Sequence, residues 1–206
     1  MSQPPTTIVF DLGNVLIGWE PRALYRKLFV DQPEEMEWFL GNVCTPAWNL
    51  EQDRGRRFAE AVAALSAHHP PQLRAAIHAY HERWAEMLTG EIHGSVQLLA
   101  ELHAQGTPLY ALTNWNQETF AYARERYAWL SRFRGIVVSG EERCVKPEPQ
   151  IYQTLLARYA LQAADCVFID DSALNVAGAR EVGMHALQFR DPLQLRADLR
   201  ALDFAV

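Results

Sequence analysis

The chain has 206 residues, of which 49% are hydrophobic and 21% are charged, so it can bury one substantial core but is too short for two large domains. Acidic residues outnumber basic ones by 25 to 19, which gives a net charge of −6. With this balance and no block of basic residues, we expect no nucleic-acid partner.

The sequence also carries no sign of export or membrane insertion. No basic segment followed by a long apolar stretch opens the chain, and no apolar run approaches the roughly 18 residues that a membrane span needs. The three cysteines, Cys44, Cys144 and Cys166, are far apart and lack CxxC spacing. This usage is typical of a reducing compartment, so we expect a cytoplasmic protein without a membrane partner.

Along the chain, five short apolar runs predict β-strands. They span residues 8–10, 109–112, 136–138, 166–169 and 185–189. Continuous apolar runs of this length suit strands buried on both faces of a parallel sheet. Between them, apolar residues at helical spacing predict helices over 96–102, 151–156 and 173–180. Strands and helices that alternate in this way predict an α/β fold with a doubly wound, Rossmann-like parallel sheet.

The alternation is interrupted after the first strand. From about residue 21 to residue 89 no convincing strand appears, and the segment is rich in Ala, Leu, Trp and His with scattered prolines. It predicts a small helical cap inserted into the sheet domain. We place the core domain at residues 1–18 and 90–206 and the helical cap domain at 19–89. Because no long linker flanks the insert, we expect it to pack against the sheet domain.

Reactive side chains follow the predicted strands. They are a carboxylate, a hydroxyl with an amide, a lysine and an acidic pair: Asp11, Thr113, Asn114, Lys146, Asp170 and Asp171. Because ligands bind at the carboxyl ends of parallel strands, we expect these side chains to meet at one edge of the sheet. The set matches phosphoryl transfer through an aspartyl-phosphate. An acidic pair cannot face a phosphate without a cation, so the pattern implies Mg²⁺.

The motifs around these residues resemble those of the haloacid dehalogenase superfamily. They are FDLGNV at residues 10–15, LTN at 112–114, VKPEPQIY at 145–152 and FIDDS at 168–172. Each motif alone is weak evidence for this resemblance, but four motifs in this order, each near a predicted strand end, are strong evidence. A helical insert between the first two motifs is similar to the small-cap branch, and the first motif is similar to that of bacterial sugar-1-phosphate phosphatases.

The resemblance implies a nucleophile and a metal site. Asp11 would be the nucleophile and a metal ligand, and the backbone carbonyl of Gly13 would be a second ligand. Asp171 would coordinate Mg²⁺ directly, and Asp170 would do so directly or through water.

The resemblance also implies a phosphate site. Thr113 and the amide of Asn114 would hold the phosphate, and Lys146 would pair with both the phosphate and the Asp11 carboxylate. Together these roles imply a magnesium-dependent phosphatase whose partner is a small phosphorylated metabolite, in particular a sugar phosphate.

One position departs from the usual pattern of the superfamily. Its phosphatases normally place a second aspartate, the general acid/base, two residues after the nucleophile, where this chain has Gly13. Proton transfer by a positioned group typically contributes about 10²–10⁴ in rate. The loss predicts a preference for good leaving groups such as anomeric phosphates, unless another residue supplies the proton. Glu20, at the start of the cap, is one candidate.

Two other functions remain open at this stage. A 2-haloacid dehalogenase of the same superfamily would use Asp11 to attack carbon, and its first motif also lacks the second aspartate. Dehalogenases need no metal, however, and the Asp170-Asp171 pair would repel an anionic substrate. A catalytically weak protein that binds a phosphorylated metabolite would keep the site without its acid/base.

Aromatic and basic side chains of the cap give further candidates. Trp19 and Trp48 either pack between cap and core or face the substrate. Arg54, Arg56 and Arg57 form a small basic cluster, which is either a solvated helix face or a contact to a phosphate or carboxylate.

Overall fold

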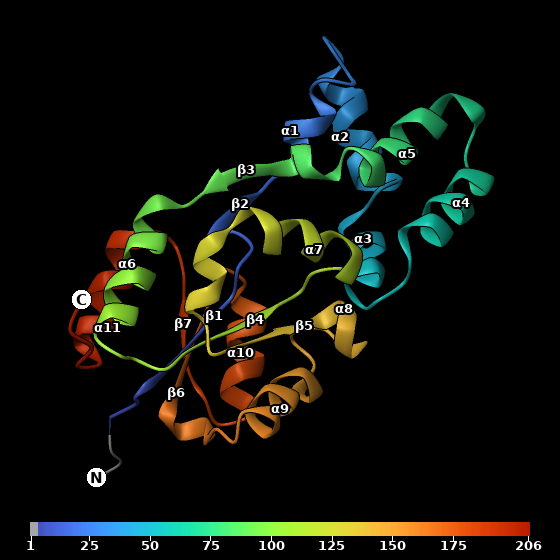
Figure 1. The fold of residues 1–206 in the computed structure, drawn as a ribbon. Helices are drawn as coiled ribbons and strands as arrows, with labels where there is room; N and C mark the ends of the chain where they lie inside the picture. Colours follow the sequence, from blue (N-terminus) through green and yellow to red (C-terminus); the bar gives the residue numbers. More distant parts are fainter. Residues whose placement is uncertain (1–3) are drawn as a thin grey trace.

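The computed structural model describes residues 4–206, and among these residues five parallel strands form the central sheet. They are β1 (Thr7–Phe10), β4 (Leu109–Thr113), β5 (Gly135–Val138), β6 (Cys166–Asp170) and β7 (His185–Gln188). The strands lie in the order β5-β4-β1-β6-β7 (Figure 1). The register pairs Val9 with Tyr110 of β4 and with Phe168 of β6. The predicted α/β fold with a doubly wound, Rossmann-like sheet is confirmed.

The central strand, β1, is the point where the chain changes direction across the sheet. From β1 the chain adds β4 and β5 on one side and then β6 and β7 on the other. Such a reversal opens a crevice at the carboxyl ends of the strands that flank it, where α/β proteins bind ligands.

Helices cover both faces of the sheet. One face packs against α6 (His93–Ala104), α7 (Gln117–Arg126) and α11 (Pro192–Ala201), and the other against α9 (Pro149–Arg158) and α10 (Ala173–Glu181). Side chains of β1 alternate between the two layers, because Ile8 and Phe10 belong to the first apolar core and Val9 to the second. Burial on both faces explains why this strand is apolar from Ile8 to Phe10.

A two-stranded antiparallel ribbon, β2 (Ile17–Trp19) and β3 (Leu88–Glu91), connects the sheet domain to the cap (Figure 1). The sequence analysis did not predict it. The first strand has only three residues with Gly18 at its centre, and the second contains Gly90. Strands this short, with a glycine inside, lack the alternating pattern by which strands are recognised.

The cap lies between β2 and β3, as the predicted helical insertion requires. Its helices are α1 (Arg22–Tyr25), α2 (Pro33–Asn42), α3 (Pro46–Asp53), α4 (Phe58–His68) and α5 (Arg74–Glu82). The remaining short helices are α8 (Ser139–Glu142), η1 (Pro71–Leu73), η2 (Trp84–Met87), η3 (Ala128–Arg132) and η4 (Ala163–Asp165). Phe39, Phe58 and Tyr80 of the cap belong to the same buried cluster as Ile8 and Phe10 of β1. The cap therefore packs against the sheet domain, as expected.

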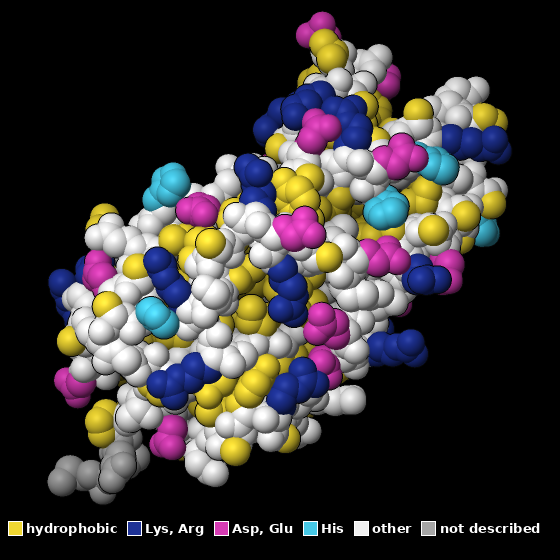
Figure 2. Space-filling model, viewed as in Figure 1, with side chains coloured by type: hydrophobic (Ala, Val, Ile, Leu, Met, Phe, Trp, Pro, Cys, Tyr) yellow, Lys and Arg dark blue, Asp and Glu magenta, His cyan; other side chains and the backbone are white. Residues whose placement is uncertain are grey.

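On the surface, basic and acidic side chains lie interspersed over most of the face drawn in Figure 2, with apolar side chains between them. Among residues 4–206, no helix combines the length and the apolar character needed to cross a membrane.

Candidate active site

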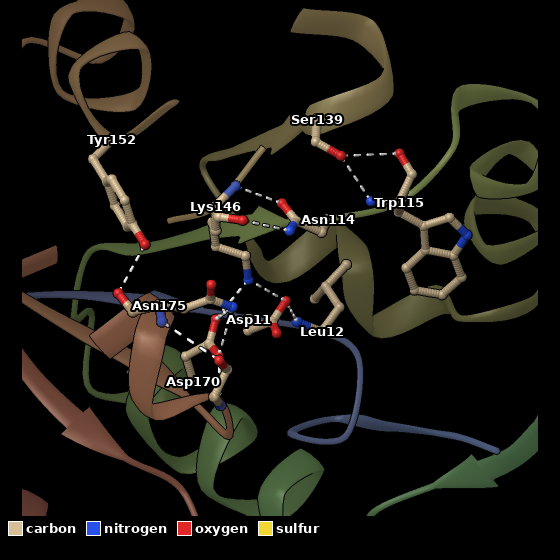
Figure 3. Close-up of polar contacts among 10 residues, drawn as sticks. Asp11, Leu12, Asn114, Trp115, Ser139, Lys146, Tyr152, Asp170 and Asn175 are labelled. Carbon is tan, nitrogen blue, oxygen red and sulfur yellow. Dashed lines mark hydrogen bonds and ion pairs between the residues drawn. The ribbon is translucent and has the colours of Figure 1, made fainter. Parts of the chain in front are cut away.

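The side chains that follow the strands meet at the carboxyl edge of the sheet, as the sequence analysis expected. Asp11 follows β1, Thr113 ends β4 and Asp170 ends β6. Because β1 lies between β4 and β6, these positions are adjacent. Lys146 reaches the same place from the loop between α8 and α9 (Figure 3).

The ammonium group of Lys146 lies between two carboxylates. Its Nζ is 2.9 Å from Oδ1 of Asp11 and 2.6 Å from Oδ2 of Asp170. The side chains of Lys146 and Asp170 are 1% and 0% exposed, and that of Asp11 is 10% exposed. Charges buried this deeply need close partners, because each has lost its hydration. The three groups therefore form one electrostatic unit.

The backbone of Lys146 is held by Asn114. The side-chain Nδ2 of Asn114 donates to the carbonyl oxygen of Lys146 at 3.0 Å, and its Oδ1 accepts from the Lys146 N–H at 2.8 Å (Figure 3). The side-chain amide of Asn114 is thus occupied in positioning the lysine, a role that the sequence analysis did not foresee. Its spacing of 32 residues from Lys146 gives no local signal for such a pair.

Asp170 is fixed by the start of the following helix. Its Oδ1 accepts from the Ser172 N–H at 2.8 Å, and Nδ2 of Asn175 lies 3.1 Å from Oδ1 and 3.2 Å from Oδ2. Ser172 also caps α10 by accepting from the Asn175 N–H. The sequence analysis missed Asn175, although its place in the first turn after an acidic pair was the available signal.

The carboxylates of the cluster outnumber its one positively charged side chain. Burial raises the pKa of Asp11 to about 8, with the charges of Asp170 and Asp171 adding to the rise and Lys146 opposing it. Burial and the charge of Asp170 also raise the pKa of Asp171. Burial lowers the pKa of Lys146, but the carboxylates of Asp11 and Asp170 outweigh it and hold that pKa above its ordinary value. A single ammonium faces three carboxylates.

The same carboxylates fit a divalent cation. Asp11, Asp170 and Asp171 each offer an oxygen atom, and these atoms lie within 4.8 Å of one another. Hard cations such as Mg²⁺ prefer oxygen ligands of this kind. The predicted ligand Gly13 lines the pocket above the cluster together with Asp11 and Asp171, so all four predicted metal ligands are brought together.

Two polar atoms in the site have no hydrogen-bond partner among residues 4–206. Oγ1 of Thr113 is buried and makes no hydrogen bond with any atom of residues 4–206. Both donors to Asp11, the Leu12 N–H at 2.7 Å and the Lys146 ammonium, contact its Oδ1. Within the described chain no hydrogen bond reaches its Oδ2. A buried hydroxyl is seldom left unpaired, which is consistent with a ligand atom that binds Thr113.

A pocket of about 160 Å³ lies between the sheet edge and the cap. The sheet domain contributes Asp11, Gly13, Asn14, Asn114, Trp115 and Asp171 to its lining, the β2–β3 ribbon contributes Ile17, Trp19 and Leu88, and the cap contributes Asn49, Asp53 and Trp84. Drug-sized ligands occupy pockets of about 300–1,000 Å³. This pocket therefore suits a small ligand with both polar and apolar parts.

The structure shows which of three candidate residues, Trp19, Trp48 and Glu20, line the pocket. Trp19 lines the pocket and stacks on Trp84 with ring centroids 5.1 Å apart, whereas Trp48 packs edge-on against Tyr80 and does not line it. Glu20 lies outside the pocket lining, and its Oε1 accepts from the Arg22 backbone at 3.0 Å. Glu20 is thus not placed to replace the missing acid.

Other pocket residues were not singled out from the sequence. Trp84 and Trp115 are indistinguishable there from core tryptophans, and both are in fact mostly buried. Asp53 and Asn49 are polar residues in an amphipathic helix, where most such residues face solvent. Only the packing of the cap on the sheet turns them toward the pocket.

Comparison with known families gives a match over most of the chain. A family model described as haloacid dehalogenase-like hydrolase matches residues 5–183. Among characterised proteins, a sesquiterpene phosphatase from Aspergillus oryzae is 36% identical over 105 residues, which cover 51% of this chain and 54% of that protein. The matched region spans about half or less of the full length of the first characterised relatives.

Solved structures share the fold. A HAD family enzyme from Bacteroides thetaiotaomicron, crystallised with magnesium and inorganic phosphate, has a TM-score of 0.67 at 21% identity, covering 91% of this chain and 95% of that one. An L-2-haloacid dehalogenase from Xanthobacter autotrophicus has a TM-score of 0.62 at 17% identity, covering 96% and 83% of the two chains.

Proposed function

Because the chain belongs to the haloacid dehalogenase-like hydrolase family, we propose that it is a magnesium-dependent phosphatase acting on a small phosphorylated metabolite. One observation carries the proposal: three carboxylates with oxygens within 4.8 Å of one another face a single buried ammonium. Such a cluster attracts a divalent cation, and a cation with a lysine can hold a phosphate dianion. The superfamily resemblance noted in the sequence thus holds.

We assign the metal to Asp11, Asp171 and the carbonyl oxygen of Gly13, with Asp170 bound directly or through water. When bound, Mg²⁺ would neutralise the charge that otherwise keeps a phosphate away from the Asp11 carboxylate. Asp170 already accepts hydrogen bonds from Ser172 and Asn175 and pairs with Lys146. In this proposal the main role of Asp170 is therefore to position Lys146.

The chain's own residues supply the nucleophile and the phosphate site. Oδ2 of Asp11 attacks phosphorus, since Oδ1 is occupied by the Leu12 N–H and Lys146. The Thr113 hydroxyl and the backbone N–H of Asn114 hold phosphate oxygens, while the Asn114 side chain keeps Lys146 in place. The leaving oxygen departs as an alcohol, and water then hydrolyses the aspartyl-phosphate to regenerate Asp11.

The pocket supports a small substrate of mixed polarity, such as a sugar phosphate. The indole rings of Trp19 and Trp84 offer apolar surface, and Asn49 and Asp53 offer hydrogen-bonding groups. In this proposal residues 19–89 form the cap that covers the organic part, and residues 1–18 and 90–206 form the core that binds the phosphate. A volume of about 160 Å³ disfavours a long terpenoid chain.

Phosphate release from a panel of sugar phosphates, measured with Mg²⁺ and with excess chelator, tests the proposal. We expect release only with Mg²⁺, because the Asp11 carboxylate cannot approach a phosphate dianion without a bridging cation. Undiminished release in chelator would refute it. A parallel assay of halide release from chloroacetate tests the dehalogenase alternative. Tight binding of sugar phosphates without turnover would instead identify a binding protein.

A further inference from the structure

The proposed reaction needs a proton donor that the first motif does not provide. Gly13 occupies the position of the usual acid, and it has no side chain to titrate. A Cβ built on Gly13 would meet no atom within 4 Å, so the pocket is open beside it. A donor can therefore reach the leaving oxygen from another wall.

Asp53, the last residue of α3, lines this same pocket from the cap. Among the residues that line the pocket, the carboxylates are Asp11, Asp53 and Asp171. Asp11 and Asp171 are already assigned to the nucleophile and the metal. Asp53 is the carboxylate left without a role, and it belongs to the cap, which covers the organic part of the substrate.

The helix that carries Asp53 has a defined start. Thr45 caps α3 by accepting from the Trp48 N–H at 3.0 Å, and Pro46 occupies its first turn. One turn before Asp53, Asn49 donates from Nδ2 to Oδ2 of the Asp53 carboxylate at 2.9 Å. This bond fixes the orientation of the carboxylate within the cap.

Side chains of the sheet domain fix the backbone around Asp53. Oγ of Ser139 donates to the carbonyl oxygen of Asp53 at 2.5 Å, and Nδ2 of Asn116 donates to that of Gln52 at 2.7 Å. At Gly55 the two domains touch so closely that a Cβ there would lie 2.7 Å from the carbonyl oxygen of Gly140. The cap thus presents Asp53 to the pocket in a position set by the core.

The surroundings of Asp53 suit a group that gives and takes a proton near neutral pH. Burial raises its pKa to about 7, opposed by the Asn116 backbone N–H and the charge of Lys146. Burial and the charge of Asp53 raise the pKa of the Tyr80 phenol, on α5, and Asp11 and Asp171 share the pocket. A general acid/base works best when its pKa lies near the working pH.

We propose that Asp53 is the general acid/base of the reaction, replacing the aspartate absent at Gly13. As Asp11 Oδ2 bonds to phosphorus and the P–O bond to the substrate breaks, the Asp53 carboxyl gives its proton to the departing alkoxide. Water then attacks phosphorus, its proton passes to Asp53, and the bond between Asp11 and phosphorus breaks to release phosphate. The assignment rests on the proposed phosphatase function.

This assignment changes one expectation from the sequence. If Asp53 protonates the leaving oxygen, the rate of the wild-type enzyme should depend only weakly on the leaving group. Anomeric phosphates are then no longer expected to react faster than other sugar phosphates. The dependence of rate on the leaving group should instead appear when Asp53 is removed.

The decisive experiment compares wild type with Asp53→Asn on an alkyl phosphate and on p-nitrophenyl phosphate. For the alkyl ester, whose oxygen must be protonated, we expect kcat/KM to fall by about 10²–10⁴-fold. For p-nitrophenyl phosphate we expect kcat/KM to fall less than about tenfold, because nitrophenolate leaves without a proton. The aspartyl-phosphate should then accumulate, giving a burst of p-nitrophenol equal to the enzyme concentration.

Controls separate this role from a structural one. Glu60→Gln, a neutralising change at an exposed residue of the next cap helix, α4, should leave both substrates unaffected. An equal loss on both substrates without a burst, or no loss at all, would overturn the assignment of Asp53. A wild-type enzyme without magnesium-dependent phosphate release would instead refute the phosphatase function.

A pH profile of the wild type tests the assignment without any variant. Because Asp53 must be protonated in the first step, kcat/KM for the alkyl ester should decline as the pH rises above about 7. With p-nitrophenyl phosphate this decline should be much weaker. Equal profiles for the two esters, or a steep preference of wild type for good leaving groups, would contradict the proposal even if Asp53→Asn failed to fold.

Discussion

The substitution Lys146→Met probes the electrostatic unit on which the site depends. It keeps an unbranched side chain of similar length but removes the ammonium that lies 2.9 Å from Asp11 and 2.6 Å from Asp170. The carboxylate of Asp170, which is fully buried, then loses its only ion-pair partner among residues 4–206. We expect the folded state to lose stability as well as the ability to bind phosphate.

The distances give the size of the effect. With an effective dielectric constant near 20, each of the two ion pairs contributes a gross attraction of roughly 6 kcal/mol. Desolvation of the three groups offsets most of this, and losing one partner of a buried pair typically costs about 3–5 kcal/mol. For a chain of this length that cost corresponds to a fall in Tm of about 7–12 °C.

The pH dependence has a definite sign. Without the ammonium, the buried Asp11 carboxyl avoids an unpaired charge by binding a proton, so its pKa in the folded state, already raised by burial, rises further above its unfolded value. A group with a raised folded pKa stabilises the folded state at low pH and loses that effect as the pH increases. The stability deficit of Lys146→Met should therefore shrink on acidification, by up to about 1.4 kcal/mol per pH unit from the Asp11 carboxyl.

Urea unfolding followed by tryptophan fluorescence at pH 8 and at pH 6 measures both effects. The matched control is Lys27→Met, which removes an exposed pair with Glu86 at 2.7 Å and should cost less than about 1 kcal/mol. If Lys146→Met were no less stable than the control, or if its deficit grew on acidification, Lys146 would not be the counter-charge described above.

Two further predictions concern turnover. Asp11→Asn should lower kcat by at least about 10³-fold while preserving the circular dichroism spectrum, because the amide is nearly isosteric but is a poor nucleophile; substantial residual activity would reduce Asp11 to a binding role. Arg54→Ala, which removes the contacts of 2.7 and 2.9 Å to Glu148, should slow alkyl phosphates more than p-nitrophenyl phosphate. Its free energy of unfolding should change by less than about 1 kcal/mol, since the pair is partly exposed. Arg57→Ala, at an exposed arginine 3.8 Å from Glu118, is the control.

The fold was largely predictable because its strands are buried on both faces. Runs such as Ile8-Val9-Phe10 can only be interior strands or parts of buried helices, and their regular alternation with helices favours strands. The β2–β3 ribbon gave no comparable signal, because its strands are short and are partly buried by contacts with the cap. Tertiary packing rather than local sequence determines that these residues pair.

The position of a candidate site residue was predictable where its side chain lies at the end of a strand, as with Asp11, Thr113 and Asp170. It was not predictable where the partner is distant in sequence. Asn114 lies 32 residues from the Lys146 backbone that it holds, and Asp53 reaches the pocket only because the cap helix docks on the sheet. Glu20 was a candidate for proton transfer because it lies at the start of the cap, yet its carboxylate accepts a hydrogen bond from the Arg22 backbone N–H.

The location of Asp53 links proton transfer to the docking of the cap. An acid at residue 13 would lie in the same loop after β1 as the nucleophile and would be available whatever the position of the cap. Asp53 instead depends on contacts between domains, including the pair between its neighbour Arg54 and Glu148, two residues after Lys146. We expect loosening that pair to displace the acid more than Asp11 and Thr113, which lie at the ends of β1 and β4. Only substrates that need a proton should then react more slowly, which is the pattern expected for Arg54→Ala; an equal loss on both esters would indicate that the pair positions the substrate rather than the acid.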